Sequence, residues 1–90
     1  MTPAQRSDWP IRGIMADPAR LIEKHSFYFD LLEMMAEWGL NTLWWHFVDD
    51  QGFQLVLDGH PELATPHAFT KPEMARLLAK AESLGIDVVP

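Results

Sequence analysis

The stretch N-T-L-W-W-H-F-V, residues 41–48, decides the fold. It is rich in β-branched and aromatic residues and almost continuously apolar. That composition is typical of a strand in a parallel sheet that is covered on both faces. Because successive side chains of a strand point to opposite faces, we expect Trp44 and Trp45 to lie on different sides of the sheet, one of them beneath a helix. The run Asp-Asp-Gln-Gly at 49–52 ends the strand in turn residues.

The sequence before this strand predicts another strand and a helix. The short apolar run Ile11–Ala16 predicts a buried strand, and Asp17-Pro18 ends it in a loop. From Ser26 to Trp38 the apolar spacing becomes helical, with Ser26 as N-cap and Gly39 as the left-handed residue that ends the helix. The apolar face of this helix is predicted to comprise Phe27, Leu31, Met35 and Trp38, widened by Leu32 and Met34.

The sequence after residue 52 predicts an irregular segment, a second helix and a third strand. Residues 53–69 are irregular, with a short extended piece at Phe53–Leu57. Thr70-Lys71-Pro72-Glu73 has the form of a capping box, and the helix that it begins ends at Gly85. Ile86–Val89 then predicts a short buried strand. The apolar stripe of the second helix is predicted at Met74, Leu77, Leu78, Ala81 and Leu84.

This order of strand, helix, strand, helix and strand predicts a parallel sheet with crossover helices. Three strands and two helices leave both sheet edges and one face uncovered, whereas parallel sheets are almost always covered on both faces. We therefore expect residues 11–90 to be the first part of a larger α/β domain, and residues 1–10 to be a leader or linker end. Because even a compact domain of this size buries only roughly 60–65% of its unfolded surface, we expect the isolated chain to be loosely folded or aggregation-prone.

Composition excludes several classes of function. The 90 residues are 48% hydrophobic and 22% charged, as expected for one small globular domain. Seven Lys and Arg against 13 Asp and Glu give a net charge of -6, so no nucleic-acid partner is expected. No apolar run approaches the ~20 residues of a membrane span. The first fifteen residues lack a signal-peptide core, which favours the cytoplasm while leaving the compartment open. The absence of Cys excludes disulfides and thiolate metal sites.

Charged residues are predicted to gather at one edge of the sheet. Ligands of parallel α/β folds bind beyond the carboxyl ends of the strands, and two predicted loops occupy that position. The first loop carries Asp17 and Arg20, and the second carries Asp49 and Asp50, with His46 just inside the strand. Loops at the opposite edge carry almost no charged groups. This asymmetry indicates a site at the carboxyl edge.

Each of these residues also has a purely structural interpretation. Asp17 and the Asp49–Asp50 pair are common turn residues, Arg20 fits a solvated loop cation, and His46 fits a core histidine in an apolar strand. A divalent metal site built on His46, Asp49 and Asp50 is disfavoured, because the spacing matches no strong metal motif and no second His lies nearby in the sequence. No phosphate-binding loop, nucleophile elbow or H-E-x-x-H motif is present, and we expect no cofactor.

Several of these segments together resemble a known enzyme family. Residues 12–20, R-G-I-M-A-D-P-A-R, resemble the R-G-x-x-x-D-x-x-R opening of the catalytic barrel in family 20 glycoside hydrolases, the β-N-acetylhexosaminidases. Residues 41–53 are similar to the family segment N-x-L-x-W-H-x-x-D-D-Q-G, which a Trp or Phe follows. The P-E-L at 61–63 and the G-I-D-V-V-P at 85–90 match further segments in the same order and spacing.

The resemblance implies a fold and a reaction. Residues 11–90 would be the β-α-β-α-β portion, the first three strands, of a (β/α)8 TIM barrel that removes terminal non-reducing N-acetylglucosamine or N-acetylgalactosamine from glycans. Such enzymes retain configuration by substrate assistance, in which the sugar's own 2-acetamido oxygen attacks the anomeric carbon. An Asp–Glu pair after strand four orients the acetamido group and supplies the acid and base. The rest of the barrel is expected C-terminal to Pro90, so we expect the 90-residue chain alone to be inactive.

The resemblance also assigns roles to residues at matching motif positions. Arg20 would bind hydroxyls of the amino sugar, because a guanidinium fork suits adjacent hydroxyls. Asp49 would support a histidine beyond strand three that contacts the acid–base Glu, and so would act on catalysis only through that network. Asp17, His46 and Asp50 match family positions around these two residues.

Three positions depart from the family pattern, and two other interpretations stay open. Leu21 and Trp44 stand where many members carry His, and Gln54 stands where Arg is frequent, which leaves the sugar preference open. The chain could instead come from another carbohydrate-active TIM-barrel protein or a sugar-binding relative. A continuation without the acidic pair would favour this interpretation. It could also be a small α/β interaction protein that associates with itself through its open edges, which concentration-dependent association of a well-folded chain would favour.

Overall fold

The computed structural model describes residues 9–21, 23–49 and 51–90, so most of the predicted leader and Asp50 of the predicted site lie outside the described residues. No helix among those three ranges is long and apolar enough to cross a membrane. The elements follow the predicted order, with one added 3-10 helix. They are β1 (Gly13–Ala16), α1 (His25–Glu37), β2 (Thr42–Trp45), η2 (Pro61–Leu63), α2 (Lys71–Ser83) and β3 (Asp87–Val89).

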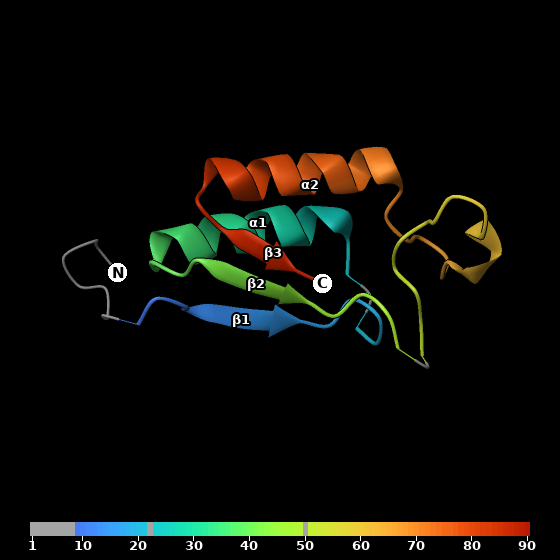
Figure 1. Ribbon diagram of the computed structural model, residues 1–90, viewed down its shortest axis with the longest axis horizontal. Coiled ribbons are helices and arrows are strands. Elements are labelled where there is room, and N and C mark those ends of the chain that lie inside the picture. The colour runs from blue at the N-terminus through green and yellow to red at the C-terminus, as the bar shows by residue number, and fades with distance from the viewer. Residues whose placement is uncertain (1–8, 22, 50) are drawn as a thin grey trace.

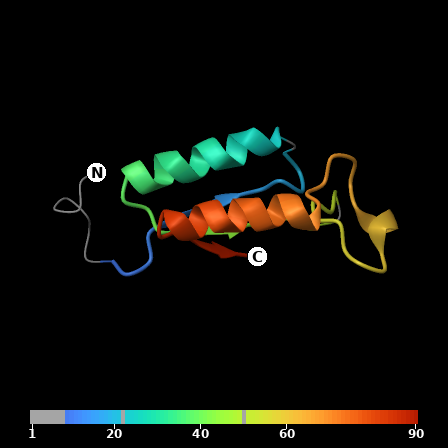
Figure 2. The same cartoon turned by 90° about the horizontal axis from the view of Figure 1, so that it is seen from above.

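The three strands form one parallel sheet with β2 in the centre, as the order of elements predicts. The register places Met15, Trp44 and Val89 side by side across the sheet. Both helices lie on the same side of the sheet (Figures 1 and 2). The sheet therefore has one covered face and one open face, which confirms the prediction that a face is left without a helix.

Each strand is shorter than the apolar run that predicts it. Ile11, Asn41 and Ile86 precede the observed strands instead of beginning them, and the apolar run 46–48 leaves the sheet after Trp45. It leaves because Val48 pairs antiparallel with Phe53 across the turn at 49–52. His46 consequently lies just after β2, not inside it as predicted, although its N–H still donates to the Ala16 carbonyl at 2.9 Å.

Helix α1 corrects two further predictions. It begins at His25 with Lys24 as N-cap and no side-chain capping bond, so Ser26 is not the cap. Its buried side chains are Tyr28, Leu32 and Met35, whereas the predicted face members Phe27, Met34 and Trp38 are exposed. Apolar residues surround much of this helix, and the ring contacts of Tyr28 with Trp45 and Phe69 select the side that packs inward. The predicted end at Gly39 is confirmed by its φ of 77°.

Helix α2 begins and ends as predicted. Thr70 accepts from the Glu73 N–H at 3.3 Å and donates its own N–H to Glu73 Oε1 at 3.0 Å, which completes the capping box. Gly85, with φ 72°, follows the last turn. Leu77 and Ala81 of the predicted stripe are buried, whereas Leu78 is exposed.

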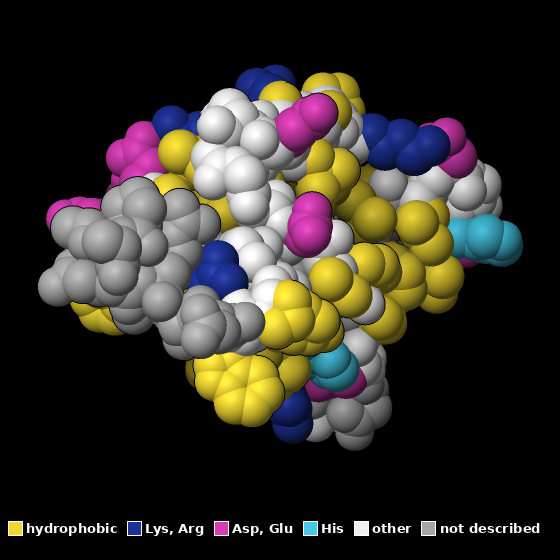
Figure 3. Space-filling view, turned by 60° about the vertical axis from the view of Figure 1, so that its left-hand side comes forward, with side chains coloured by type: hydrophobic (Ala, Val, Ile, Leu, Met, Phe, Trp, Pro, Cys, Tyr) yellow, Lys and Arg dark blue, Asp and Glu magenta, His cyan; other side chains and the backbone are white. Residues whose placement is uncertain are grey.

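The hydrophobic core lies between the two helices and the covered face of the sheet. Trp45 is 2% exposed within this core, whereas Trp44 on the open face is 39% exposed, so the two side chains do lie on opposite sides. Met15 and Val89 beside Trp44 are also exposed, and hydrophobic side chains gather visibly on the face drawn in Figure 3. The buried cluster comprises Tyr28, Leu32, Met35, Leu43, Trp45, Phe69, Leu77, Ala81 and Ile86.

Candidate functional site

Two loops at the carboxyl ends of β1 and β2 bring together the predicted site residues that the structure describes. Asp17 follows β1 directly, and its carbonyl accepts the Leu21 N–H at 2.9 Å, which closes a turn that carries Arg20. His46 follows β2, and its carbonyl accepts the Ala19 N–H at 3.4 Å. This bond joins the two loops, because residues 19 and 46 lie on different ones.

Arg20 lies between two carboxylates. Its Nε is 2.7 Å from Asp17 Oδ2 and 3.0 Å from Asp49 Oδ2. The Arg20 backbone N–H also donates to Asp17 Oδ1 at 3.1 Å. The Arg20 side chain is 55% exposed, whereas those of Asp17 and Asp49 are 15% and 14% exposed. The two carboxylates thus hold the positively charged guanidinium of Arg20 at the carboxyl edge of the sheet, where solvent reaches it.

The pKa of Asp17 reflects this arrangement. Partial loss of solvent raises the pKa of the Asp17 carboxyl. The side-chain and backbone hydrogen bonds from Arg20, together with the charges of Arg20 and His46, lower this pKa by a larger amount. The net pKa is below the usual value, so Asp17 is the anionic partner of Arg20 near neutral pH. Asp17 therefore combines the predicted turn role with an ion pair.

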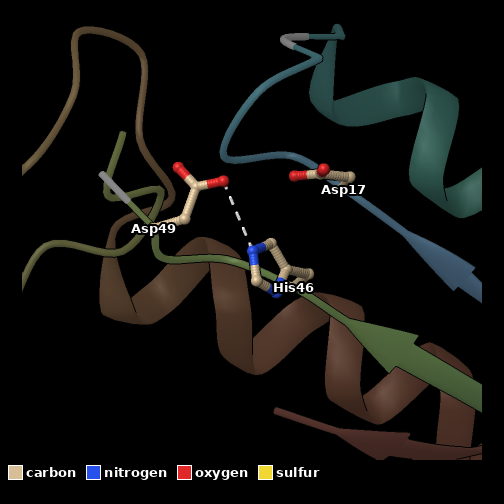
Figure 4. A group of neighbouring side chains, drawn as sticks. All are labelled: Asp17, His46 and Asp49. Carbon is tan, nitrogen blue, oxygen red and sulfur yellow. Dashed lines mark ion pairs between the residues drawn. The ribbon is translucent and has the colours of Figure 1, made fainter. Parts of the chain in front are cut away.

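Asp49 is fixed by its own turn and contacts both loops. Its backbone N–H donates to the Gly52 carbonyl at 3.0 Å, and its Oδ1 accepts the Gln51 N–H at 2.7 Å. Its Oδ2 lies 3.4 Å from His46 Nε2. Figure 4 shows Asp17 and Asp49 pointing toward one another beside His46. Since the His46 side chain is 38% exposed and pairs with Asp49, its interpretation as a core histidine is wrong.

The same three side chains have the spacing of a metal-binding group, but Arg20 occupies their oxygens. One ligand-type atom from each of Asp17, His46 and Asp49 lies within 4.8 Å of the others. The Oδ2 atoms of both carboxylates, however, already pair with Arg20 Nε. A guanidinium shared by two carboxylates offsets one of their two negative charges and occupies the oxygens that an ion would need, so the geometry favours a charged hydrogen-bonding cluster as the interpretation of this site.

Gly52 and Thr65 support the site, and the sequence analysis assigns neither of them a role in it. A Cβ on Gly52 would lie 2.6 Å from the Ala19 carbonyl oxygen and 2.9 Å from Thr65 Oγ1. Thr65 Oγ1 accepts the Phe53 N–H at 2.6 Å. The close approach presses the turn at 49–52 against the loop that carries Arg20. The sequence predicts a turn at Gly52 and an irregular segment around Thr65, and neither prediction indicates that these two residues contact each other.

The three departures from the family pattern fall at different places. Leu21 is 70% exposed beside Arg20, and Trp44 lies on the open face of the sheet. Gln54 is 3% exposed, and its side-chain nitrogen finds no hydrogen-bond partner among the described residues. The three departures from the family pattern therefore do not share one place in the structure: Leu21 is at the surface, Trp44 is on the open face and Gln54 is buried.

Fold and site together define the class. A parallel α/β unit with a charged cluster at the carboxyl ends of its strands is the arrangement of α/β enzymes, whose sites lie at that edge. The pattern of the catalytic domain of glycosyl hydrolase family 20 matches residues 9–90. The chain therefore belongs to glycosyl hydrolase family 20, and so to the glycoside hydrolases.

Individual relatives agree with this assignment. The chain is 34% identical to a β-hexosaminidase of Akkermansia muciniphila, over 91% of this chain and 20% of that protein. It is also 34% identical to the β-hexosaminidase subunit beta of Rattus norvegicus, over 99% of this chain and 18% of that protein. The chain thus spans about a fifth of the length of these relatives.

Solved structures show the same fold. A chitobiase of Flavobacterium johnsoniae matches with a TM-score of 0.84 and 31% identity over 89% of this chain and 13% of that one. An exo-β-N-acetylglucosaminidase of Vibrio harveyi, solved in complex with N-acetylglucosamine, matches with a TM-score of 0.85 and 26% identity over 92% of this chain and 16% of that one. The three parallel strands and two helices described above are consistent with a portion of such a TIM-barrel enzyme.

Proposed function

We propose that residues 11–90 are the first three strands of the (β/α)8 barrel of a retaining β-N-acetylhexosaminidase, which hydrolyses terminal N-acetylglucosamine or N-acetylgalactosamine from glycans. The observation that carries the proposal is Arg20, held by Asp17 and Asp49 at the carboxyl edge of the sheet. Membership of the family and the charged cluster at the edge where barrels bind ligands support it.

Arg20 would bind the sugar. Its guanidinium is a planar group of N–H donors, which suits two neighbouring hydroxyls of a pyranose ring. Two carboxylates fix the Nε side of the group, so its orientation is set before the sugar arrives. Such preorganisation lowers the entropy cost of binding.

Asp49 would act through other residues. It lies 14% exposed and orients Arg20 through Oδ2, while the Gln51 N–H fixes Oδ1. In the barrel, Asp49 would also support a histidine after strand three that contacts the acid–base Glu. Asp17, His46 and Asp50 would complete the surroundings of these two residues.

The reaction would follow the substrate-assisted route. The 2-acetamido oxygen of the sugar attacks the anomeric carbon as the Glu after strand four protonates the leaving oxygen, and the neighbouring Asp orients the acetamido group. The same Glu then takes a proton from the water that opens the cyclic intermediate. The strand that would carry this pair follows the third strand, so the 90 residues supply binding and orientation without the acid.

The test is hydrolysis of 4-nitrophenyl N-acetyl-β-D-glucosaminide by the protein made from the whole coding sequence that contains these residues. We expect hydrolysis by that protein, none by the 90-residue polypeptide, and a loss of about 10²-fold or more in kcat/KM for Arg20→Ala, since a misplaced substrate costs about that much. Arg76→Ala, at an exposed position on α2, is the matched control. Turnover by the 90 residues alone, or full activity of Arg20→Ala, would overturn the proposal.

The open sheet face favours a second candidate for the isolated chain, which is self-association. Met15 is 63% exposed next to Trp44 and Val89, so a row of apolar side chains has no cover among the described residues. Sedimentation equilibrium of the 90-residue chain at rising concentration distinguishes the two. A well-folded, reversible dimer would favour an interaction protein, and disordered aggregation would favour part of a larger barrel.

A further inference from the structure

His25, the first residue of α1, joins the beginnings of the two helices. Its Nδ1 lies 2.7 Å from Oε2 of Glu73 in the first turn of α2, and its Nε2 lies 2.8 Å from the backbone carbonyl oxygen of His67. The imidazole also stacks on Phe69, with ring centroids 3.8 Å apart and planes inclined by 15°. Three contacts from one loop and one helix therefore hold a single ring.

The two polar contacts determine how many protons the ring must carry. A backbone carbonyl and an ionised carboxylate are both acceptors only. A neutral imidazole has one N–H and one lone pair, so it satisfies one of these oxygens and turns a lone pair toward the other. The doubly protonated ring donates to both. The geometry around His25 therefore fits an imidazolium better than either neutral tautomer.

Glu73 remains an anion throughout the range in which histidines titrate. The backbone and side-chain hydrogen bonds from Thr70, followed by the bond from His25, lower the pKa of Glu73 to about 2 against a smaller opposing effect of burial. The capping-box partner of α2 is thus also the counter-charge of His25.

We propose that His25 is a proton-dependent clasp. With both ring nitrogens protonated, it ties the start of α1 to the capping box of α2 and to the loop before it, and loss of one proton releases one of these two ties.

The charged surroundings of the ring are mixed. Glu73 faces it from α2, while Glu23 and Lys24 from the segment before α1 line the same surface cavity as His25 and His67. Helix N-termini disfavour a nearby cation, and His25 lies at the beginning of α1 and next to that of α2. The direct contact with Glu73 acts in the opposite direction and favours the cation. His67 has a φ of 66°, a left-handed conformation that is rare for a residue with a side chain, and its carbonyl is an acceptor of the clasp.

The clasp ties the far ends of the two loops that carry the candidate site. The first loop runs from Asp17 to the start of α1, and the second runs from His46 to the start of α2. Protonation of His25 would therefore fix how these loops lie relative to one another. The proposal does not depend on the sugar or on catalysis. The clasp can therefore be disproved while the proposed function stands, and the proposed function can be disproved while the clasp stands.

The first experiment counts the protons on the ring in the protein made from the whole coding sequence that contains these residues, because the isolated 90 residues are expected to be loosely folded. Selectively ¹⁵N-labelled histidine allows the state of each ring to be assigned by NMR at pH 7, where an unperturbed imidazole has mostly lost its second proton. We expect two protonated nitrogens on His25, because both of them face acceptors. A single N–H on His25 at pH 7 would overturn the proposal.

The second experiment measures the linkage between protonation and folding. Urea unfolding at pH 5.5 and pH 8 is compared for the wild type, His25→Gln and the matched control His60→Gln. A clasp that needs both ring protons keeps both ties at the lower pH and loses one as the pH rises, so the stability that it contributes is larger at pH 5.5 than at pH 8. The unfolding constant of the wild type and of His60→Gln is expected to increase more over this range than that of His25→Gln.

A third variant, Glu73→Gln, tests the same contact from its other side if His25→Gln does not fold. Glu73→Gln keeps an N3 side chain that can complete a capping box but removes the counter-charge. It is expected to lose most of the pH dependence that the wild type shows. If His25→Gln and Glu73→Gln both keep the pH dependence that the wild type and His60→Gln show, the clasp does not exist.

Discussion

Trp44 and Trp45 are neighbours in the sequence and have the same side chain, yet they lie in opposite surroundings. Trp45 is 2% exposed and contacts the rings of Tyr28, Phe47 and Phe69. Trp44 is 39% exposed on the face of the sheet that no helix of the described residues covers (Figure 1). The two residues allow the contribution of core packing to stability to be compared with that of an exposed side chain on the open face. The residue type is the same in both cases, and only the face of the sheet differs.

The largest expected effect breaks the covered face. Trp45→Ala should cost about 3–5 kcal/mol of unfolding free energy, since it removes a fully buried ring and leaves a cavity, whereas Trp44→Ala should cost about 1 kcal/mol. Urea unfolding followed by far-UV circular dichroism measures both. Trp45→Phe should cost less than Trp45→Ala, because it keeps the ring contacts and removes an indole N–H that has no partner among the described residues. Equal effects of the two alanine variants would contradict the comparison.

The next effect tests a tightly packed point on the open face, at Gly13. A Cβ on Gly13 would lie 2.3 Å from the Thr42 carbonyl oxygen and 2.7 Å from the ring of Trp44. The backbone oxygen has little freedom to move, so Gly13→Ala should cost about 1–3 kcal/mol through overpacking. Gly59→Ala is an instructive control, because a Cβ there meets nothing within 4 Å, although its φ of +81° adds some strain. A Gly13→Ala chain as stable as the wild type would show that β1 and β2 separate easily.

A smaller effect concerns the beginning of α2, away from both tryptophans. Thr70→Ala should cost about 1 kcal/mol through loss of the N-cap. The pKa of Glu73 is about 2, below its ordinary value of 4.5, so its stabilising contribution is complete above about pH 4.5 and is lost as the pH falls toward 2. Acid titration of the unfolding free energy should therefore be less steep in Thr70→Ala than in the wild type. Parallel titration curves would contradict this assignment.

The smallest effect on stability is expected at the open face itself. Met15→Ser should change the unfolding free energy by about 0.5 kcal/mol or less, because the side chain is 63% exposed. The same change should reduce association of the chain, since it interrupts the apolar row formed with Trp44 and Val89. Light scattering at matched concentrations of the wild type and Met15→Ser measures this. If Met15→Ser scatters light as strongly as the wild type, the surface through which the chain associates lies elsewhere.

Local signals in the sequence predict most of the fold. The capping box at Thr70, the positive-φ residues Gly39 and Gly85, and the opposite faces of the two tryptophans are all set by neighbours along the chain. The buried face of α1 could not be predicted in this way. Apolar side chains nearly surround that helix, and the choice of Tyr28 over Phe27 depends on Trp45 and Phe69, which follow far later in the sequence.

The candidate site divides in the same manner. Asp17, Arg20, His46 and Asp49 could be predicted to meet, because the topology of a parallel sheet brings the ends of adjacent strands together. The support from Thr65 could not be predicted, since it joins residues across an irregular segment. The contact of His25 with Glu73 spans 48 positions and leaves no pattern in the sequence.

The order β1-β2-β3 makes β2 and β3 each the spatial neighbour of the strand synthesised just before it. A ribosome that releases the chain from its N-terminus thus delivers β1, α1 and β2 as a unit that can pair at once, without waiting for distant sequence. Trp45 then stays partly uncovered until Phe69 and α2 have been translated. During synthesis, the indole of Trp45 therefore lacks part of its final packing, and the speed at which residues 46–77 leave the ribosome sets how long it remains exposed.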